Sequence, residues 1–240
     1  MIKKFNSLFA VALLLPLSLF AEESNYALNQ SATLGDIISR GGPLMYVLLF
    51  LSFLAFCLIF YYLFSLRTEV IAPKNLITQL EEKKKDIEML SQICSENESP
   101  LAKIIVAGLE TAKKTDARYE SIKDSVEDEG ARQAGALWNR IQYLQDIAII
   151  SPMVGLLGTV LGMIKSFGAL YSENITPKPT IIAQGIAMAL ITTAAGLVIG
   201  IFSMIVYSYF RGVVNKLVAE LESISGKLCR EIIANAFPKK

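Results

Sequence analysis

Long apolar segments alternate with charged ones along this chain. The longest uncharged segment covers residues 180–210 and contains no Asp, Glu, Lys, Arg or His. As a helix rising ~1.5 Å per residue it would be ~46 Å long, which exceeds the ~30 Å hydrocarbon core of a bilayer. Two further apolar segments lie within residues 42–65 and 144–171. The pattern predicts three membrane-spanning helices, at 42–65, 144–171 and 180–210.

The distribution of positive charge predicts how these helices are oriented. Most Lys and Arg residues lie in two segments, 66–143 and 211–240. Lys and Arg accumulate in the cytoplasmic loops of membrane proteins. We therefore expect a cytoplasmic helical domain at 66–143 and a cytoplasmic carboxyl-terminal helix at 211–240. Residues 172–179 would then form a short periplasmic loop.

The amino-terminal segment has the form of a signal peptide. Residues 1–21 contain Lys3 and Lys4, then an apolar stretch that ends at Ala21, directly before Glu22. A basic start, a short apolar core and a small residue before the cut are typical of secretory signals. We expect cleavage after Ala21, which would leave residues 22–41 as a periplasmic segment. Retention as an anchor is the alternative and leaves the later topology unchanged.

The charged segments are predicted to be helical. Proline is tolerated in the first turn of a helix, so Pro73 and Pro100 favour helices at about 73–93 and 100–112. A third helix is expected from Asp116 into the second span, and the third span should continue as an amphipathic helix. Apolar residues form one stripe of that continuation: Val214, Leu217, Leu221 and Ile224.

The predicted fold class is all-α: a polytopic membrane protein whose second and third spanning helices extend into the cytoplasm. The tyrosines at the end of the first span, Tyr61 and Tyr62, are expected at the membrane interface.

Small and hydroxyl-bearing residues gather on one face of the second and third spans. Spacings of three and four residues place the members of each set on the same side of a helix. Small residues mark where another backbone comes close in a membrane, and ordinary helix packing is the simplest explanation of them. Pro152 should bend the second span because it removes one backbone hydrogen bond. The two sets are Gly155, Gly158, Thr159 and Gly162, and Gly185, Ala189 and Thr193.

Composition excludes several classes of function. The net charge of +1 offers no clustered basic surface, so we expect no nucleic-acid partner. The chain has no histidine, which excludes histidine metal ligands and a Ser-His-Asp triad. Its three cysteines are far apart in the sequence and predict neither a disulfide framework nor a metal site. We expect no enzyme activity, no cofactor and no bound metal.

The predicted spans also lack a group that could carry a proton. Thr does not titrate in the useful pH range, and no Asp, Glu or His lies within residues 147–164 or 180–210. Asp146 and Lys165 fall at opposite ends of the second span, where a charged side chain can reach the head-group layer. If the protein conducts protons, the titrating carboxylate must come from another chain. A closed ring of identical subunits could enclose the membrane helix that carries it.

Four sequence runs resemble the MotA/TolQ/ExbB proton-channel family, and within it the ExbB and TolQ branch. They are ISP at 150–152, GLLGTVLGMI at 155–164, SF at 166–167 and GIAMALITTAAGL at 185–197. The resemblance implies an inner-membrane pentamer around an ExbD- or TolR-like partner that supplies an intramembrane Asp. Such a complex would pass work to a TonB- or TolA-like protein. It also implies that Thr159 and Thr193, with Thr192 adjacent, line the ion pathway.

The small residues of the two faces are expected to pack against the partner's helix. They are Gly155, Gly158, Gly162, Gly185, Ala189 and Gly196. The chain departs from the family at Met188, where ExbB and TolQ prototypes carry a glutamate. A pathway in this chain would then depend wholly on the partner's acid.

Three other functions stay open from the sequence. The first is a TolQ-like role in envelope maintenance, which would use the same membrane engine. The second is a sodium-driven stator, because sodium sites need several oxygen ligands and threonines can supply some of them. The third is a scaffold that holds a partner's helix and conducts nothing, for which small residues alone suffice.

Overall fold

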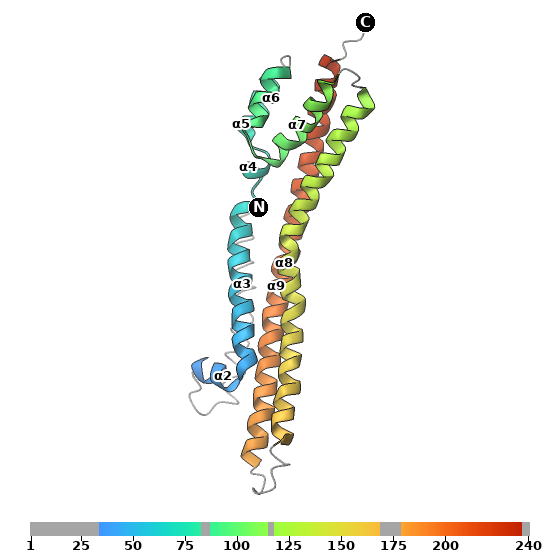
Figure 1. Ribbon diagram of the computed structural model, residues 1–240. Helices are drawn as coiled ribbons and strands as arrows, with labels where there is room; N and C mark the ends of the chain where they lie inside the picture. Colours follow the sequence, from blue (N-terminus) through green and yellow to red (C-terminus); the bar gives the residue numbers. More distant parts are fainter. Residues whose placement is uncertain (1–33, 83–86, 115–117, 169–178, 237–240) are drawn as a thin grey trace. The chain divides into compact units, whose positions relative to one another are not determined.

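The chain is all-α, as the sequence predicts, in a computed structural model that describes residues 34–82, 87–114, 118–168 and 179–236. This part of the chain contains no strand. The expected signal peptide and almost all of the expected periplasmic loop lie outside the described residues. The helices are drawn in Figure 1: α2 Leu34–Arg40, α3 Pro43–Ser65, α4 Thr68–Ile71, α5 Lys74–Glu82, α6 Ile87–Ser95, α7 Pro100–Ala112, α8 Tyr119–Gly168 and α9 Pro179–Ala236.

Three of these helices are long and apolar enough to cross a membrane: α3, α8 and α9. The apolar part of α8 and α9 occupies only one section of each helix, and both continue well beyond it. The three expected spans are therefore found. The chain is a multi-pass membrane protein with two long helices. The expected start of the helix that becomes α8, at Asp116, lies outside the described residues.

Two compact units divide the described chain. The first combines residues up to Leu58 with Leu144–Val206, and the second combines Ile59–Tyr143 with residues from Tyr207 onward. Each of the helices α3, α8 and α9 thus contributes one section to each unit. The first unit holds most of the apolar sections, and the second holds the charged ones.

Helix α3 presents a broad apolar surface in the first unit. The Phe50, Phe53 and Phe56 side chains are 64%, 67% and 58% exposed, whereas Leu48 and Ala55 are buried. Phenylalanine exposed to this extent would be costly in water but not in lipid. This surface suits contact with acyl chains.

The second unit has an aliphatic core built from α7, α8 and α9. Its α7 begins with Ser99 as N-cap, whose hydroxyl accepts a hydrogen bond from the Ala102 N–H at 3.3 Å, and with Pro100 in the first turn. The predicted helix at 100–112 is confirmed. Buried side chains come from all three helices: Leu101, Ile104, Leu109, Ile122, Leu137, Ile141, Val214, Leu217 and Leu221.

The expected stripe on the end of α9 is nearly right. Val214, Leu217 and Leu221 are buried, but Ile224 is only half-buried and Ser225 is buried in its place. A helix turns about 100° per residue, so a buried face drifts by one position after two or three turns. The spacing of apolar residues predicts which side of α9 is buried, but it does not predict that the buried side shifts from Ile224 to Ser225.

Tyr61 and Tyr62 differ sharply, although the sequence treats both as interfacial residues. Tyr61 is 55% exposed, whereas Tyr62 is 2% exposed. The Tyr62 hydroxyl donates a hydrogen bond to the Arg140 carbonyl of α8, and its ring meets the edge of Phe210 on α9 at 5.7 Å between centroids. For Tyr62 the interfacial interpretation is wrong, because its hydroxyl has a protein partner and its ring is enclosed. Tyr62 fastens the end of α3 to both long helices.

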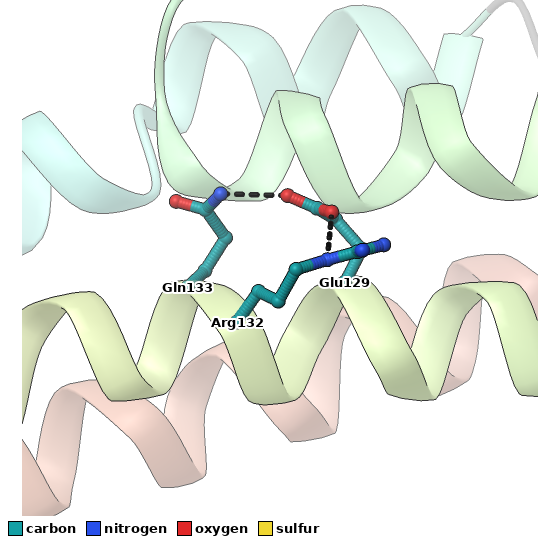
Figure 2. Close-up of polar contacts among 3 residues, drawn as sticks. All are labelled: Glu129, Arg132 and Gln133. Atoms are coloured by element: carbon teal, nitrogen blue, oxygen red, sulfur yellow. Dashed lines mark hydrogen bonds and ion pairs between the residues drawn. The ribbon is translucent and has the colours of Figure 1, made fainter.

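The charged section of α8 carries its own polar contacts along the helix. Figure 2 shows Glu129 held by two neighbours: Arg132 Nε at 2.8 Å and Gln133 Nε2 at 2.7 Å, each donating to a different carboxylate oxygen. These partners lie three and four residues further along, the spacing at which helix side chains meet. Such pairs support an exposed helix by a few tenths of a kcal/mol each. They suit a helix section that lies in water.

Candidate functional site

The two small-residue faces predicted from the sequence meet each other within the first unit. Residues 148–166 of α8 lie against residues 182–200 of α9, and we call this contact the α8–α9 seam. Gly162 meets Gly185 and Ala189, Gly155 meets Thr192 and Thr193, and Gly196 meets Ser151. Along the seam the residue numbers increase on α8 as they decrease on α9. The two helices therefore run antiparallel.

Glycine is required along the seam because the facing backbone leaves no room for a side chain. A Cβ placed on Gly196 would lie 2.5 Å from the Ser151 carbonyl oxygen and 3.0 Å from the Gly155 Cα. A Cβ on Gly162 would lie 2.7 Å from the Gly185 carbonyl oxygen. Backbone atoms cannot move aside as a flexible side chain can. The structure thus gives an intrachain packing role to residues that the sequence assigns to a partner helix.

Thr193 makes a hydrogen bond across the seam. It is half-buried, and its hydroxyl donates to the Gly155 carbonyl of α8 at 2.9 Å, 38 residues away in the sequence. A hydroxyl usually bonds to its own helix in a membrane span, so a bond to the neighbouring helix fixes the register of the pair. Of the three predicted pathway residues, Thr193 is the one whose hydroxyl links the two spans.

Thr192 is enclosed by the seam. Its side chain is fully buried, stands against Gly158, and donates within its own helix to the Met188 and Ala189 carbonyls, both at 3.0 Å. This shared bond satisfies the hydroxyl without any partner chain. Thr192 acts within the chain as a packing residue that fills the space above Gly158.

Thr159 lies at the edge of the packed region. It is half-buried and donates to the Leu156 carbonyl of its own helix at 2.6 Å. The neighbouring side chains Leu156 and Val160 are exposed. The Thr192 hydroxyl also bonds only to its own helix, but Thr192 is fully buried. Thr159 combines such a bond with neighbours that face outward. It is the best placed to meet a further chain.

Two serines belong to the seam but were not predicted as site residues. Ser166 is buried and donates to Gly162 of its own helix and across to the Ile182 carbonyl, both at 3.1 Å. Ser151 is buried and donates to the Ile147 carbonyl at 2.7 Å. Each lies four residues from a seam glycine, Gly162 or Gly155, and that spacing is the signal that could have identified them.

The polar character of the seam is therefore that of hydroxyls and carbonyls. No acidic side chain occurs in residues 147–164 or 180–210. Asp146 and Lys165, at the two ends of this section of α8, are both exposed. The described residues contain no group of three acidic or cysteine side chains that could hold a metal. Hydroxyls and carbonyls can orient water or an ion, but none of them titrates near neutral pH.

Met188 lies on the third span, one helical turn before Thr192. The side chain is half-buried and lies against Gly42, whose positive φ of 70° starts the chain into α3. A Cβ on Gly42 would lie 2.7 Å from the Met188 Sδ atom. A soft apolar thioether thus packs against backbone here, and no acid is available at this point of the chain.

Comparison with known proteins identifies the region that contains the seam. The sequence profile of the MotA/TolQ/ExbB proton channel family matches residues 96–223. A biopolymer transport protein ExbB homolog from Methanothermobacter thermautotrophicus is 27% identical over 201 residues, covering 82% of this chain and 70% of that protein. The biopolymer transport protein ExbB of Aquifex aeolicus is 34% identical over 113 residues, 46% of this chain and 76% of that protein. The Tol-Pal system protein TolQ of Haemophilus influenzae is 39% identical over 77 residues, about a third of each chain.

Proposed function

Because the chain belongs to the MotA/TolQ/ExbB proton channel family, we propose that it is the channel-forming subunit of an inner-membrane complex that converts proton-motive force into mechanical work. The family match covers more than half of the chain, including the whole α8–α9 seam. Relatives named ExbB and TolQ favour that branch. In this proposal the amino terminus is periplasmic and the carboxyl terminus is cytoplasmic.

The observation that carries the proposal is a seam rich in hydroxyls and without a carboxylate. Proton transfer across a membrane needs a group that gains and loses a proton, and threonine does neither. The proposed complex therefore includes a second, single-span protein of the ExbD or TolR type with one Asp in its membrane helix. Several copies of this chain, five by the family resemblance, would surround that helix. Thr159 and Thr193 would then lie on the side that faces it.

The work would be delivered to the outer membrane through a TonB- or TolA-like protein. One relative is named as a biopolymer transport protein and another as a Tol-Pal system protein, so the proposal keeps both kinds of receiving protein. The same membrane engine would serve either one. The two differ in the protein that receives the work.

Hydroxyl-specific substitutions test the proposal. Valine has the shape of threonine without its hydroxyl, and serine keeps the hydroxyl without the methyl group. Proton flux through the reconstituted complex should be lost in Thr159→Val and in Thr193→Val, and largely kept in Thr159→Ser and Thr193→Ser. Full flux in both valine variants, with complex assembly unchanged, would overturn the proposal. Flux that follows sodium instead of pH would keep the channel and change the ion.

A scaffold is the second candidate, favoured by one observation. The Thr192, Thr193, Ser151 and Ser166 hydroxyls all have partners within the chain. They can therefore be explained by packing alone. A scaffold would hold the partner's helix and conduct nothing, so both valine variants should support normal cellular function. A channel requires that at least one of them fail.

A further inference from the structure

Ser203 is a buried hydroxyl with no hydrogen-bond partner. Its side chain on α9 is fully buried, and among the described residues its Oγ atom is the one buried side-chain polar atom left without a partner. The Thr192, Ser151 and Ser166 hydroxyls, equally enclosed, all donate to carbonyls. An unmet hydroxyl is expensive inside a protein and more so within a lipid bilayer. Ser203 therefore needs a physical explanation.

The register of the seam places Ser203 next to a specific part of α8. Gly196 lies against Ser151 and Gly155, and Gly200, one turn later, lies against Ala148 and Pro152. Each turn along α9 thus moves the contact back by one turn along α8. Ser203 is three residues beyond Gly200 on the same face, which places it opposite residues 144–148. Leu144 and Ala148 are both buried there.

The carbonyl of Ala148 lacks its usual donor within α8. In an α-helix the carbonyl of residue 148 accepts from the N–H of residue 152, but Pro152 has no N–H to donate. This carbonyl points at α9, because a Cβ on Gly200 would lie 2.8 Å from its oxygen. The seam thus brings a hydroxyl that has no partner and a carbonyl that lacks its usual helical donor to adjacent turns.

We propose that the Ser203 hydroxyl and the Ala148 carbonyl together bind one internal water molecule between α8 and α9. The water would accept a hydrogen bond from Ser203 and donate one to the Ala148 carbonyl. Ordered water is one of the ways in which membrane helices satisfy the carbonyl freed by a proline, and internal waters sit where polar groups would otherwise be unmet. No charged side chain lies between residues 147 and 164 or 180 and 210 to compete for either group. This site does not depend on the proposed ion function.

Thermal melting of the intact complex in lipid nanodiscs tests the water site. Ser203→Ala should lower the apparent melting temperature by about 2–4 °C, because the water loses one partner and the Ala148 carbonyl is left unmet. The matched control is Ser208→Ala, an exposed serine of the same helix, which should change the melting temperature by less than half as much. If the Ser203 hydroxyl were simply unmet, its removal would raise the melting temperature, and that result would overturn the proposal.

A double-mutant cycle separates the water site from a bond of Ser203 to its own helix. Pro152→Ala restores an N–H that can donate to the Ala148 carbonyl. The loss caused by Ser203→Ala should then shrink by at least half in the Pro152→Ala background. An equal loss in both backgrounds would show that Ser203 acts independently of Ala148 and would refute the site.

Direct observation covers the case in which the Pro152→Ala protein does not fold. A map of the complex that resolves ordered water should show density within hydrogen-bonding distance of both Ser203 Oγ and the Ala148 oxygen. The same density should be absent from Ser203→Ala. Other internal waters visible with this one missing would contradict the proposal.

Discussion

Thr193 on α9 donates a hydrogen bond of 2.9 Å to the carbonyl of Gly155 on α8. The absence of a side chain on Gly155 allows this close approach, since a Cβ there would lie only 3.1 Å from the Thr193 Cα. A hydroxyl and a glycine thus determine together how closely the two spans approach. A hydroxyl and a glycine meet again at Ser166, which donates to the Ile182 carbonyl of α9 and lies against Gly185.

Loss of the Thr193 hydroxyl should destabilise the pair of spans. Thr193→Val keeps the shape of the side chain and leaves the Gly155 carbonyl without this donor. We expect a loss of about 0.5–1.5 kcal/mol, as for other hydrogen bonds between membrane helices. Thr193→Ser retains the donor and should lose less than half as much. Denaturant unfolding in detergent micelles measures both, and an equal loss in the two variants would show that the methyl group, not the hydroxyl, matters.

A side chain on a seam glycine should separate the helices. Gly196→Ala would press a methyl group into the Ser151 carbonyl, at 2.5 Å, and we expect a loss of about 1–3 kcal/mol. Gly212 offers a matched control on the same helix, because a Cβ there meets nothing within 4 Å. Gly212→Ala should stabilise the helix by up to about 1 kcal/mol. Opposite shifts in the unfolding midpoint are predicted, and shifts of the same sign would contradict the packing.

Tyr62 and Tyr61 should respond differently to removal of the hydroxyl. Tyr62→Phe removes the bond to the Arg140 carbonyl and should cost about 1 kcal/mol, because that carbonyl loses a buried donor. Tyr61→Phe, at the neighbouring exposed position, should cost much less. Urea unfolding of the two variants provides the comparison. Equal stability of both would mean that the end of α3 is not held by this bond.

The Cys94 thiol should react slowly at neutral and mildly alkaline pH. Burial within the second unit raises its pKa from 9.0 to about 11, so the thiol stays protonated and only the thiolate attacks alkylating reagents. The pKa of this thiol is higher in the folded state than in the unfolded state. The contribution of the protonated thiol to the free energy of unfolding is therefore fully present below pH 9 and falls as the pH rises from about 9 towards about 11.

Alkylation followed by mass spectrometry checks the Cys94 prediction in a chain whose Cys57 and Cys229 are replaced by serine. The rate should keep rising until the pH reaches about 11. In the control, Cys94→Ala with Ser95→Cys, the thiol occupies the adjacent exposed position. That thiol should reach its full rate about two pH units lower. Identical profiles would show that Cys94 is not enclosed.

The sequence was sufficient for the spans and for the small-residue faces. Uncharged length gives a membrane helix directly, and the spacing of Gly155, Gly158 and Gly162 gives a face. It did not show that this face is filled by α9 of the same chain, because in a membrane a small residue indicates a close approach without naming the partner. Tyr62 was misjudged for a related reason: an aromatic residue at a span's end fits the interface and a buried hydrogen bond equally well.

The buried serines show a second limit of the sequence. In the sequence, Ser151, Ser166 and Ser203 cannot be told apart from an exposed serine. Only their contact with the other helix distinguishes them. Their spacing from seam glycines becomes informative once the seam is known. Burial is a property of the packed pair and cannot be read from one helix.

Identification of the proteins that purify with this chain from its native membrane tests the central claim most directly. Under the proposed proton function, the titrating group must come from elsewhere, because residues 147–164 and 180–210 contain no carboxylate. We predict a small single-span protein with one Asp in its membrane helix, present in fewer copies than this chain. A complex that contains this chain alone, and that still conducts protons when reconstituted, would contradict the account.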